Sequence, residues 1–229
     1  MIITFNNKII APAEGKWLEK GMPPIPQYSI RIKYTEGFTP SGNVVCVDPA
    51  NNIWDKYGGT NWQYIASDSQ LDEDHILEIV GANSTGVINM ANAFQNCGLI
   101  TSMPLFDTST VEGWSQAFQR SLMSTLPLYD THNIQRWGDT FYYCIGLTEI
   151  PDFDVSSATK FTGTFQNCWS VRSGILRMYN KLVALGEQVQ HNQYTFDQCG
   201  KNYNGVYASE QARLERAQIP TTWGGDMQV

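Results

Sequence analysis

The chain has 229 residues, of which 42% are hydrophobic, 12% aromatic and only 16% charged. This composition excludes an intrinsically disordered chain and allows one large domain or two small ones. The net charge of −7 and the lack of clustered Lys and Arg argue against a nucleic-acid-binding surface. We therefore expect no nucleic acid among its partners.

Residues 1–27 are predicted to form an N-terminal arm or attachment segment. The first eight lack the basic start, apolar run and small-residue cleavage site of a signal peptide. No apolar run in the chain approaches the roughly 20 residues that cross a bilayer, so neither a leader nor membrane insertion is expected. Prolines at 12, 23, 24 and 26 remove backbone donors and favour an extended chain.

Residues 28–70 are predicted to form a small β unit. Polar and apolar residues alternate strictly over 28–34, which is typical of a half-buried strand. Further strands are expected at 44–47, 53–57 and 62–65, the last two joined in a hairpin by the glycine-rich turn at 58–61.

A repeat with a period of 23 or 24 residues dominates residues 71–200. A phenylalanine recurs at 94, 118, 141 and 165, with Cys or Ser three positions later and Met, Trp or Phe four positions earlier. Such a period is typical of a solenoid whose units each supply one strand and one short helix. We expect residues 77–80 to form the first strand, and the spacing of Val111, Trp114 and Phe118 predicts one of the helices.

The repeated units resemble the BspA-like leucine-rich-repeat group of bacterial surface proteins. The recurring phrase of that group is Phe-x-x-Cys-x-x-Leu, a strand, and then Pro-x-Phe-Asp-Thr-Ser-x-Val. Here it reads Phe94-Gln-Asn-Cys97, Leu99, Pro104-Leu-Phe-Asp-Thr-Ser109 and Val111, and it returns from Phe141 to Ser156. The likeness covers about 75–225, and the second unit departs from it with Ser121 in place of Cys. The resemblance implies recognition or scaffolding and implies no reaction.

The predicted fold class is mixed α/β. We expect a leucine-rich-repeat-like solenoid of about four to five coils at 71–200, preceded by the β unit and closed by a C-terminal cap at 201–229. Helices are expected at 174–185 and at 209–218, the second capped by Ser209. The predicted repeat core consists of Phe94, Cys97, Phe118, Phe141, Cys144, Phe165, Cys168, Phe196 and Cys199.

No catalytic, cofactor-binding or metal-ligating residue is predicted. The five cysteines include no Cys-x-x-Cys pair, which indicates packing and not metal binding. Asp107, Asp130 and Asp154 are expected to cap corners, the alternative being a calcium ladder. The three histidines are far apart in the sequence, and no nucleophile elbow, phosphate loop or dinucleotide fingerprint occurs.

Tyr142, Tyr143 and Trp169 lie beside the predicted buried positions and are the candidate surface contacts. Aromatic side chains on a regular wall suit sugar or protein contacts. The alternative is that they pack against a neighbouring coil.

These patterns lead to the hypothesis of a non-enzymatic structural or attachment protein of a phage virion, a head or tail-fibre-type component. The expected partners are other virion proteins or further copies of the chain in a homo-oligomer such as a trimer, together with a glycan or protein on the host surface. The alternative is a bacterial cell-surface adhesin that binds host glycan or protein. An enzyme is the third class, and it would require converging carboxylates or histidines in a deep pocket.

Overall fold

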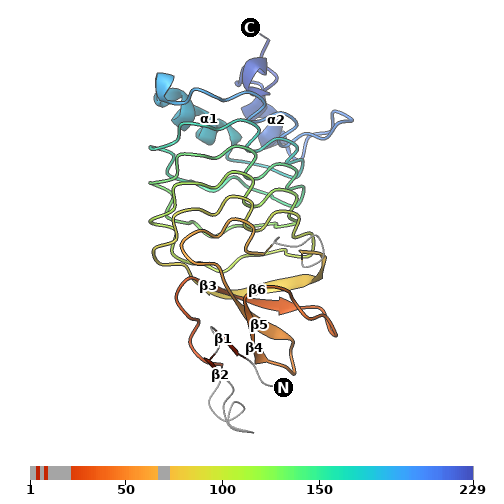
Figure 1. Cartoon of the computed structure of the whole chain (residues 1–229). Coiled ribbons are helices and arrows are strands. Elements are labelled where there is room, and N and C mark those ends of the chain that lie inside the picture. Colours follow the sequence, from red (N-terminus) through yellow and green to blue (C-terminus); the bar gives the residue numbers. More distant parts are fainter. Residues whose placement is uncertain (1–3, 6–7, 10–21, 67–72, 229) are drawn as a thin grey trace.

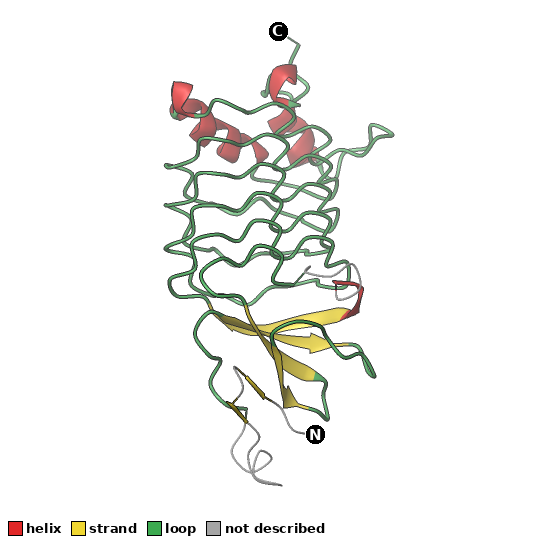
Figure 2. Cartoon of the chain, in the orientation of Figure 1, coloured by secondary structure: helices red, strands yellow, loops and turns green. Residues whose placement is uncertain are grey.

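The computed structural model describes residues 4–5, 8–9, 22–66 and 73–228. A twisted sheet lies near the N-terminal end, a tall stack of turn-rich loops follows it, and two helices lie at the far end of the stack (Figures 1 and 2). The arm predicted for 1–27 falls largely outside the described residues. The same is true of 67–72, which contain the end of the predicted β unit.

The sheet has four strands in the order β4-β5-β3-β6, and all neighbours are antiparallel. Its centre is held by Arg31 of β3 and Asp55 of β5, which face each other in the register and form a bidentate ion pair at 2.6 and 2.8 Å. The strand bounds are β3 (Ser29–Tyr34), β4 (Val44–Asp48), β5 (Ile53–Tyr57) and β6 (Ile76–Asn83), while β1 (Thr4–Phe5) and β2 (Lys8–Ile9) pair separately.

Two predictions about this region are wrong. Residues 77–80, expected as the first solenoid strand, belong to β6 and pair with β3 in the antiparallel sheet. Residues 53–65 do not form a hairpin, because β5 pairs with β4 and β3. Trp62 lies instead in the first of the stacked loops, where its backbone N–H donates to the Asn89 carbonyl at 2.7 Å.

The prediction of a mixed α/β, leucine-rich-repeat-like solenoid is also wrong. Its coils should each contain a strand and a helix, but residues 84–174 contain only turns, bends and isolated bridges. Regular structure in the described residues consists of the strands given above, the α-helices α1 (Ile175–Ala184) and α2 (Glu210–Arg216), and three one-turn 3-10 helices: η1 (Glu73–His75), η2 (Gly186–Gln188) and η3 (Thr221–Trp223).

Left-handed residues prevent the expected short helices. The residues two before and two after each repeat phenylalanine have φ between 54° and 63°, and each such residue interrupts a right-handed helix. The backbone forms overlapping turns, in which Ala117 N–H donates to Trp114 and Ser121 N–H donates to Phe118. Because these turns also bring residues three or four apart to one side, they produce the apolar spacing that predicted a helix.

The expected wall strands are absent for a related reason. Pro104, Pro127 and Pro151 stand at equivalent places in successive units, and a proline cannot donate to a strand ladder. The backbone groups bond between loops at other points, for example from Trp114 N–H to the Arg136 carbonyl at 2.9 Å. Isolated parallel bridges connect one line of positions from loop to loop, and a further bridge joins Glu149 to Ser173. The line consists of Asn61, Asn89, Gly113, Arg136, Lys160 and His191.

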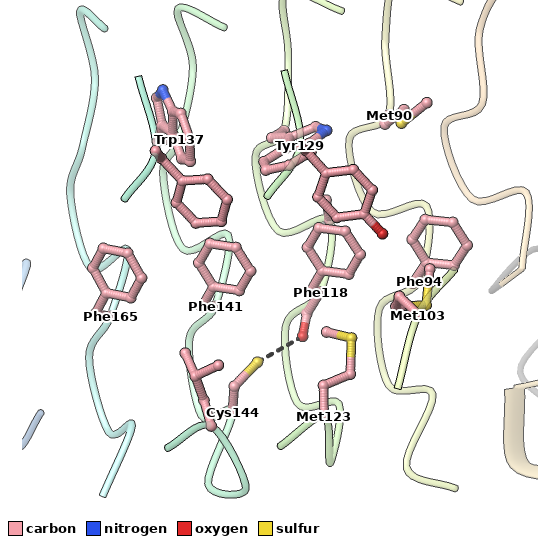
Figure 3. Close-up of a cluster of buried hydrophobic side chains, with 14 of the residues drawn as sticks. Met90, Phe94, Met103, Phe118, Met123, Tyr129, Trp137, Phe141, Cys144 and Phe165 are labelled. Atoms are coloured by element: carbon pink, nitrogen blue, oxygen red, sulfur yellow. Dashed lines mark hydrogen bonds between the residues drawn. The ribbon is translucent and has the colours of Figure 1, made fainter. Parts of the chain in front are cut away.

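A column of phenylalanine rings fills the interior of the stack (Figure 3). Neighbouring rings have centroids 5.3, 5.5, 5.3 and 6.0 Å apart and interplanar angles of 7°, 2°, 8° and 5°. Burial of each ring stabilises the fold by about 2–3 kcal/mol, and every ring needs the loop above and below it to be covered. The column consists of Phe94, Phe118, Phe141, Phe165 and Phe196.

A second column of small side chains runs beside the rings. Cys144 Sγ donates to the Phe118 carbonyl at 2.9 Å, and Ser121 Oγ donates to the Phe94 carbonyl at the same distance. Burial raises the pKa of the Cys144 thiol to about 12, so the thiol stays protonated as a donor. The four repeat cysteines, Cys97, Cys144, Cys168 and Cys199, are all buried and form no disulfide within the described residues.

The two α-helices cover the far end of the stack (Figure 1). Ser209 caps α2 by accepting from Ala212 N–H at 2.9 Å, as its sequence predicts. The N-terminus of α1 has no side-chain cap from its own segment. Glu215 of α2 fills that role, because its Oε2 accepts from Ile175 N–H at 2.7 Å and from Leu176 N–H at 3.1 Å. Within residues 22–66 and 73–228, neither of these helices nor any other is long and apolar enough to span a bilayer.

Candidate recognition surface

The overlapping turns point one set of side chains outward along the whole stack. These are the residues one and two after each phenylalanine, together with Gln116, Asp139 and Tyr194 two before it, and polar contacts join neighbouring loops. Asn92 Nδ2 donates to Gln116 Oε1 at 2.9 Å, and Gln166 Nε2 donates to Asp197 Oδ2 at 3.1 Å. We call this surface the turn face, formed by the outward side chains of segments 91–98, 115–122, 138–145, 162–169 and 193–200.

Three aromatic side chains of the turn face, Tyr142, Tyr143 and Trp169, form a continuous row with Tyr203, which follows the last of these segments. Ring centroids are 5.8 Å apart for Tyr142 and Tyr143, 5.2 Å for Tyr143 and Trp169, and 5.5 Å for Trp169 and Tyr203. Tyr142 and Trp169 are half-buried, whereas Tyr143 is 37% and Tyr203 73% exposed. The three residues that the sequence singled out thus lie together, and they also contact one another between loops. We call these four residues the aromatic row.

Tyr203 is the member that the sequence analysis missed. It lies in a short hairpin closed by the antiparallel bridge between Lys201 and Tyr207, with the turn at Asn204 and Gly205. The Asn-Gly turn is visible in the sequence. However, its position beside Trp169 depends on the stacking of the last loops, which the sequence does not reveal.

Asp139 lies in the same loop as Tyr142 and Tyr143 of the aromatic row, and its carboxylate covers Gly163 of the following loop. A Cβ placed on Gly163, in the following loop, would be 2.2 Å from Asp139 Oδ1. The carboxylate therefore occupies space that a side chain of the next loop would otherwise fill. Burial raises the pKa of Asp139, and within the described residues no protein group donates a hydrogen bond to its carboxylate. The group is available as an acceptor for a ligand.

The other candidate polar residues are engaged within the protein. Asp107 Oδ1 accepts from Ser109 Oγ at 2.6 Å and from Ser109 N–H at 2.9 Å, and these bonds lower the pKa of Asp107. Asp154 accepts from Ser156 N–H at 2.8 Å in the same way. These carboxylates stabilise the corners of the loops, and in the described part of the chain no three His, Cys, Asp or Glu side chains are grouped to hold a metal ion.

The three histidines lie in separate environments. The His75 ring stacks on Phe38 with centroids 4.2 Å apart. His132 Nδ1 lies 2.6 Å from Asp130 Oδ1 at an exposed corner, and His191 lies in the last bridge of the stack. The fold does not bring them together.

A groove of about 810 Å³ lies between α1 and α2. Its charged side chains already have partners: Glu215 caps α1, and Lys181 Nζ lies 2.7 Å from Asp152 Oδ1. The groove therefore offers no set of converging acid and base groups.

No protein-family model, no curated protein and no solved structure matches this chain. The resemblance to the BspA-like group remains a prediction from the motifs.

Proposed function

We propose that this chain is a non-enzymatic attachment protein of a phage particle, which presents the aromatic row of the turn face to a partner on the host surface. The observation that carries the proposal is the row itself. Exposed tyrosine and tryptophan side chains are the residue types that dominate recognition surfaces, because they give large contact areas at low entropic cost.

The arrangement of the molecule supports this proposal. The segments that carry the row, 138–145, 162–169 and 201–207, lie in the half of the stack away from the four-stranded sheet (Figure 1). Backbone hydrogen bonds between loops, such as Tyr143 N–H to the Gln166 carbonyl at 2.9 Å, hold the row on a rigid base. A protein with this polarity attaches through its N-terminal end and binds through the opposite half.

The experiment that tests the proposal is detection of the chain in purified particles by mass spectrometry and antibody labelling. We expect the chain in the particle fraction at a fixed ratio to the major structural proteins, in a symmetric homo-oligomer. Finding it only as a free monomer in lysates of infected cells would contradict the proposal.

The second candidate is a bacterial cell-surface adhesin, favoured by the resemblance of the repeated units to bacterial surface proteins. It uses the same row for host glycan or protein. Labelling of the chain on intact, uninfected cells by an antibody that does not enter them would establish this alternative in place of the phage protein.

A further inference from the structure

We infer that the ligand of the aromatic row is a carbohydrate chain, whose rings lie against Tyr143, Trp169 and Tyr203 and whose hydroxyl groups donate to the Asp139 carboxylate. This inference rests on the proposed recognition function and specifies its ligand class. It begins from the backbone of Tyr143.

Tyr143 holds a conformation that is unfavourable for a tyrosine. Its φ is 63°, in the left-handed region that only glycine and, less readily, asparagine enter at low cost. Equivalent positions in the other loops hold Asn96, Arg120, Asn167 and Gln198. The Tyr143 side chain is 37% exposed, and its buried part packs against the rings of Tyr142 and Trp169. The left-handed backbone is common to this position in every loop, so what distinguishes Tyr143 is an aromatic ring that is partly exposed beside Trp169.

A second exposed tyrosine with a left-handed backbone lies in the loop after Gly163. Tyr194 has φ 58° and is 61% exposed. Tyr194 occupies the position equivalent to Asp139 and Gly163, two residues before the phenylalanine of its loop. The three loops are joined by backbone hydrogen bonds from Asp139 N–H to the Thr162 carbonyl and from Gly163 N–H to the Gln193 carbonyl. Gly163 thus lies between a loop that carries the Asp139 carboxylate and a loop that carries the exposed Tyr194 ring.

The chemistry of these groups matches a sugar. The C–H faces of a pyranose ring pack against aromatic faces, and its hydroxyl groups donate to a carboxylate that has no protein donor. Successive ring centroids in the row are 5.2 and 5.5 Å apart and the ring planes are inclined at 62° and 68°, so each partly exposed ring offers a separate contact to a sugar of the chain. The amide side chains of Gln166 and Asn167 lie on the same face, and Gln166 Nε2 already donates to Asp197.

Other ligand classes fit less well. A cationic ligand would be attracted by Asp139 and the aromatic rings. However, the exposed Arg120 occupies the position equivalent to Tyr143 in the preceding loop, and its charge would repel a cation. A protein hot spot is usually a desolvated pocket, whereas the aromatic row is flanked by amide side chains.

The test uses the full chain and a microarray of bacterial capsular and O-chain polysaccharides. We expect retention on at least one polysaccharide, which free polysaccharide of the same kind competes away. Tyr143→Asn and Asp139→Asn should each reduce this retention at least tenfold. Both place asparagine at a left-handed position, so the melting temperature should stay the same or rise, and lost binding does not reflect misfolding.

Tyr64→Asn is the matched control. Tyr64 also has φ 63° and is 41% exposed, but it lies three loops away from Asp139, so its replacement should leave retention unchanged. Failure to retain any polysaccharide, or equal retention by the Tyr143 and Asp139 variants, would overturn the inference, as would capture by a protein that competes for the row. A chain found in particles but without polysaccharide binding would refute the carbohydrate ligand alone, and a binding chain absent from particles would refute the particle location alone.

Discussion

Ser121 shows what the buried position three residues after each phenylalanine requires. In this loop a hydroxyl makes the bond that a thiol makes in the next two, where Cys144 and Cys168 donate to carbonyls of the preceding loops at 2.9 and 3.0 Å. The position therefore needs a small side chain that carries a donor. Sequence similarity between Cys and Ser at this position reflects a shared hydrogen bond and no shared reactivity.

A pair of substitutions at Ser121 tests this requirement. Ser121→Ala removes the donor to the Phe94 carbonyl and should lower the free energy of unfolding by about 1 kcal/mol, since that carbonyl keeps a weaker bond from Cys97 N–H at 3.4 Å. Ser121→Cys should stay within about 0.5 kcal/mol of the parent because the thiol keeps the bond. Urea unfolding midpoints give both values. A cysteine variant as unstable as the alanine variant would refute the shared role.

At the scale of single residues, the sequence predicts burial better than conformation. Phe118 and Cys144 were expected in the core because apolar character alone indicates burial. The left-handed backbone conformation could not be predicted from the sequence, since residues as different as Asn92, Gln116 and Asp139 adopt it. The aromatic row was found in part, because Tyr142, Tyr143 and Trp169 neighbour buried positions. Asp139 was missed, since its role depends on Gly163 in another loop.

At the scale of elements, α1 depends on a residue that lies 40 positions later. Its first turn has no side-chain cap of its own, and the unpaired N–H groups of Ile175 and Leu176 are satisfied by Glu215. Buried N–H groups without acceptors cost about 1–3 kcal/mol, and a carboxylate at a helix N-terminus also interacts favourably with the helix dipole. One side chain thus connects the two helices that close the stack.

Glu215→Ala should therefore lower the free energy of unfolding by about 2–3 kcal/mol, and Glu215→Gln by about 1–2 kcal/mol because an amide oxygen still accepts one of the bonds. Amide hydrogen exchange at Ile175 and Leu176 should accelerate in both variants. Glu210→Ala is the control: this exposed residue of α2 pairs with Arg213 on the surface, and its loss should leave the free energy of unfolding nearly unchanged. Equal losses for Glu210 and Glu215 would contradict a capping role.

The elements that the sequence predicts correctly are those set by local pattern. The helix at α1 follows from apolar residues such as Ile175 and Leu182 on one face, and both are buried. The sequence pattern of β6 indicates a strand but does not show which strand it pairs with. Residues 77–80 were therefore predicted to belong to the repeat, although they lie in the antiparallel sheet. The repeat period is present in the structure. However, loops built from turns can have the same period as coils built from helices, and only the backbone conformation distinguishes the two kinds of loop.

At the scale of the whole molecule, the stack needs a closed end, which a buried charge cluster provides. Arg216 is 2% exposed and donates to the carbonyls of Phe196 and Cys199 in the last loop. Its charge is balanced by Asp226, whose carboxylate is 2.9 Å from Arg216 Nε and also bonds to Lys201 and Tyr207. An unbalanced guanidinium in this place would be costly, because a buried charge needs a partner.

Acid should open the molecule from this end. Burial alone would raise the pKa of Asp226, but hydrogen bonds and charge from Arg216 and Lys201 outweigh it and lower the pKa from 3.8 to about 2. Because the folded state favours the ionised carboxylate, its contribution is complete above pH ~4 and is lost as the pH falls toward about 2. The carboxylate is 22% exposed, so after allowance for screening we expect a loss of about 1–2 kcal/mol over this interval.

Urea unfolding at pH 7, 4, 3 and 2 measures this loss, and hydrogen exchange locates it. Exchange should accelerate first at Phe196 and Cys199, whose carbonyls Arg216 holds, while Phe118 in the middle of the stack stays protected. Asp226→Asn should be less stable at pH 7 and should lose less stability between pH 4 and 2, since it has no proton to gain. An identical pH dependence in the variant and the parent would show that other carboxylates govern acid unfolding. Uniform exchange along the stack would show that the loops unfold as one unit and not from the closed end.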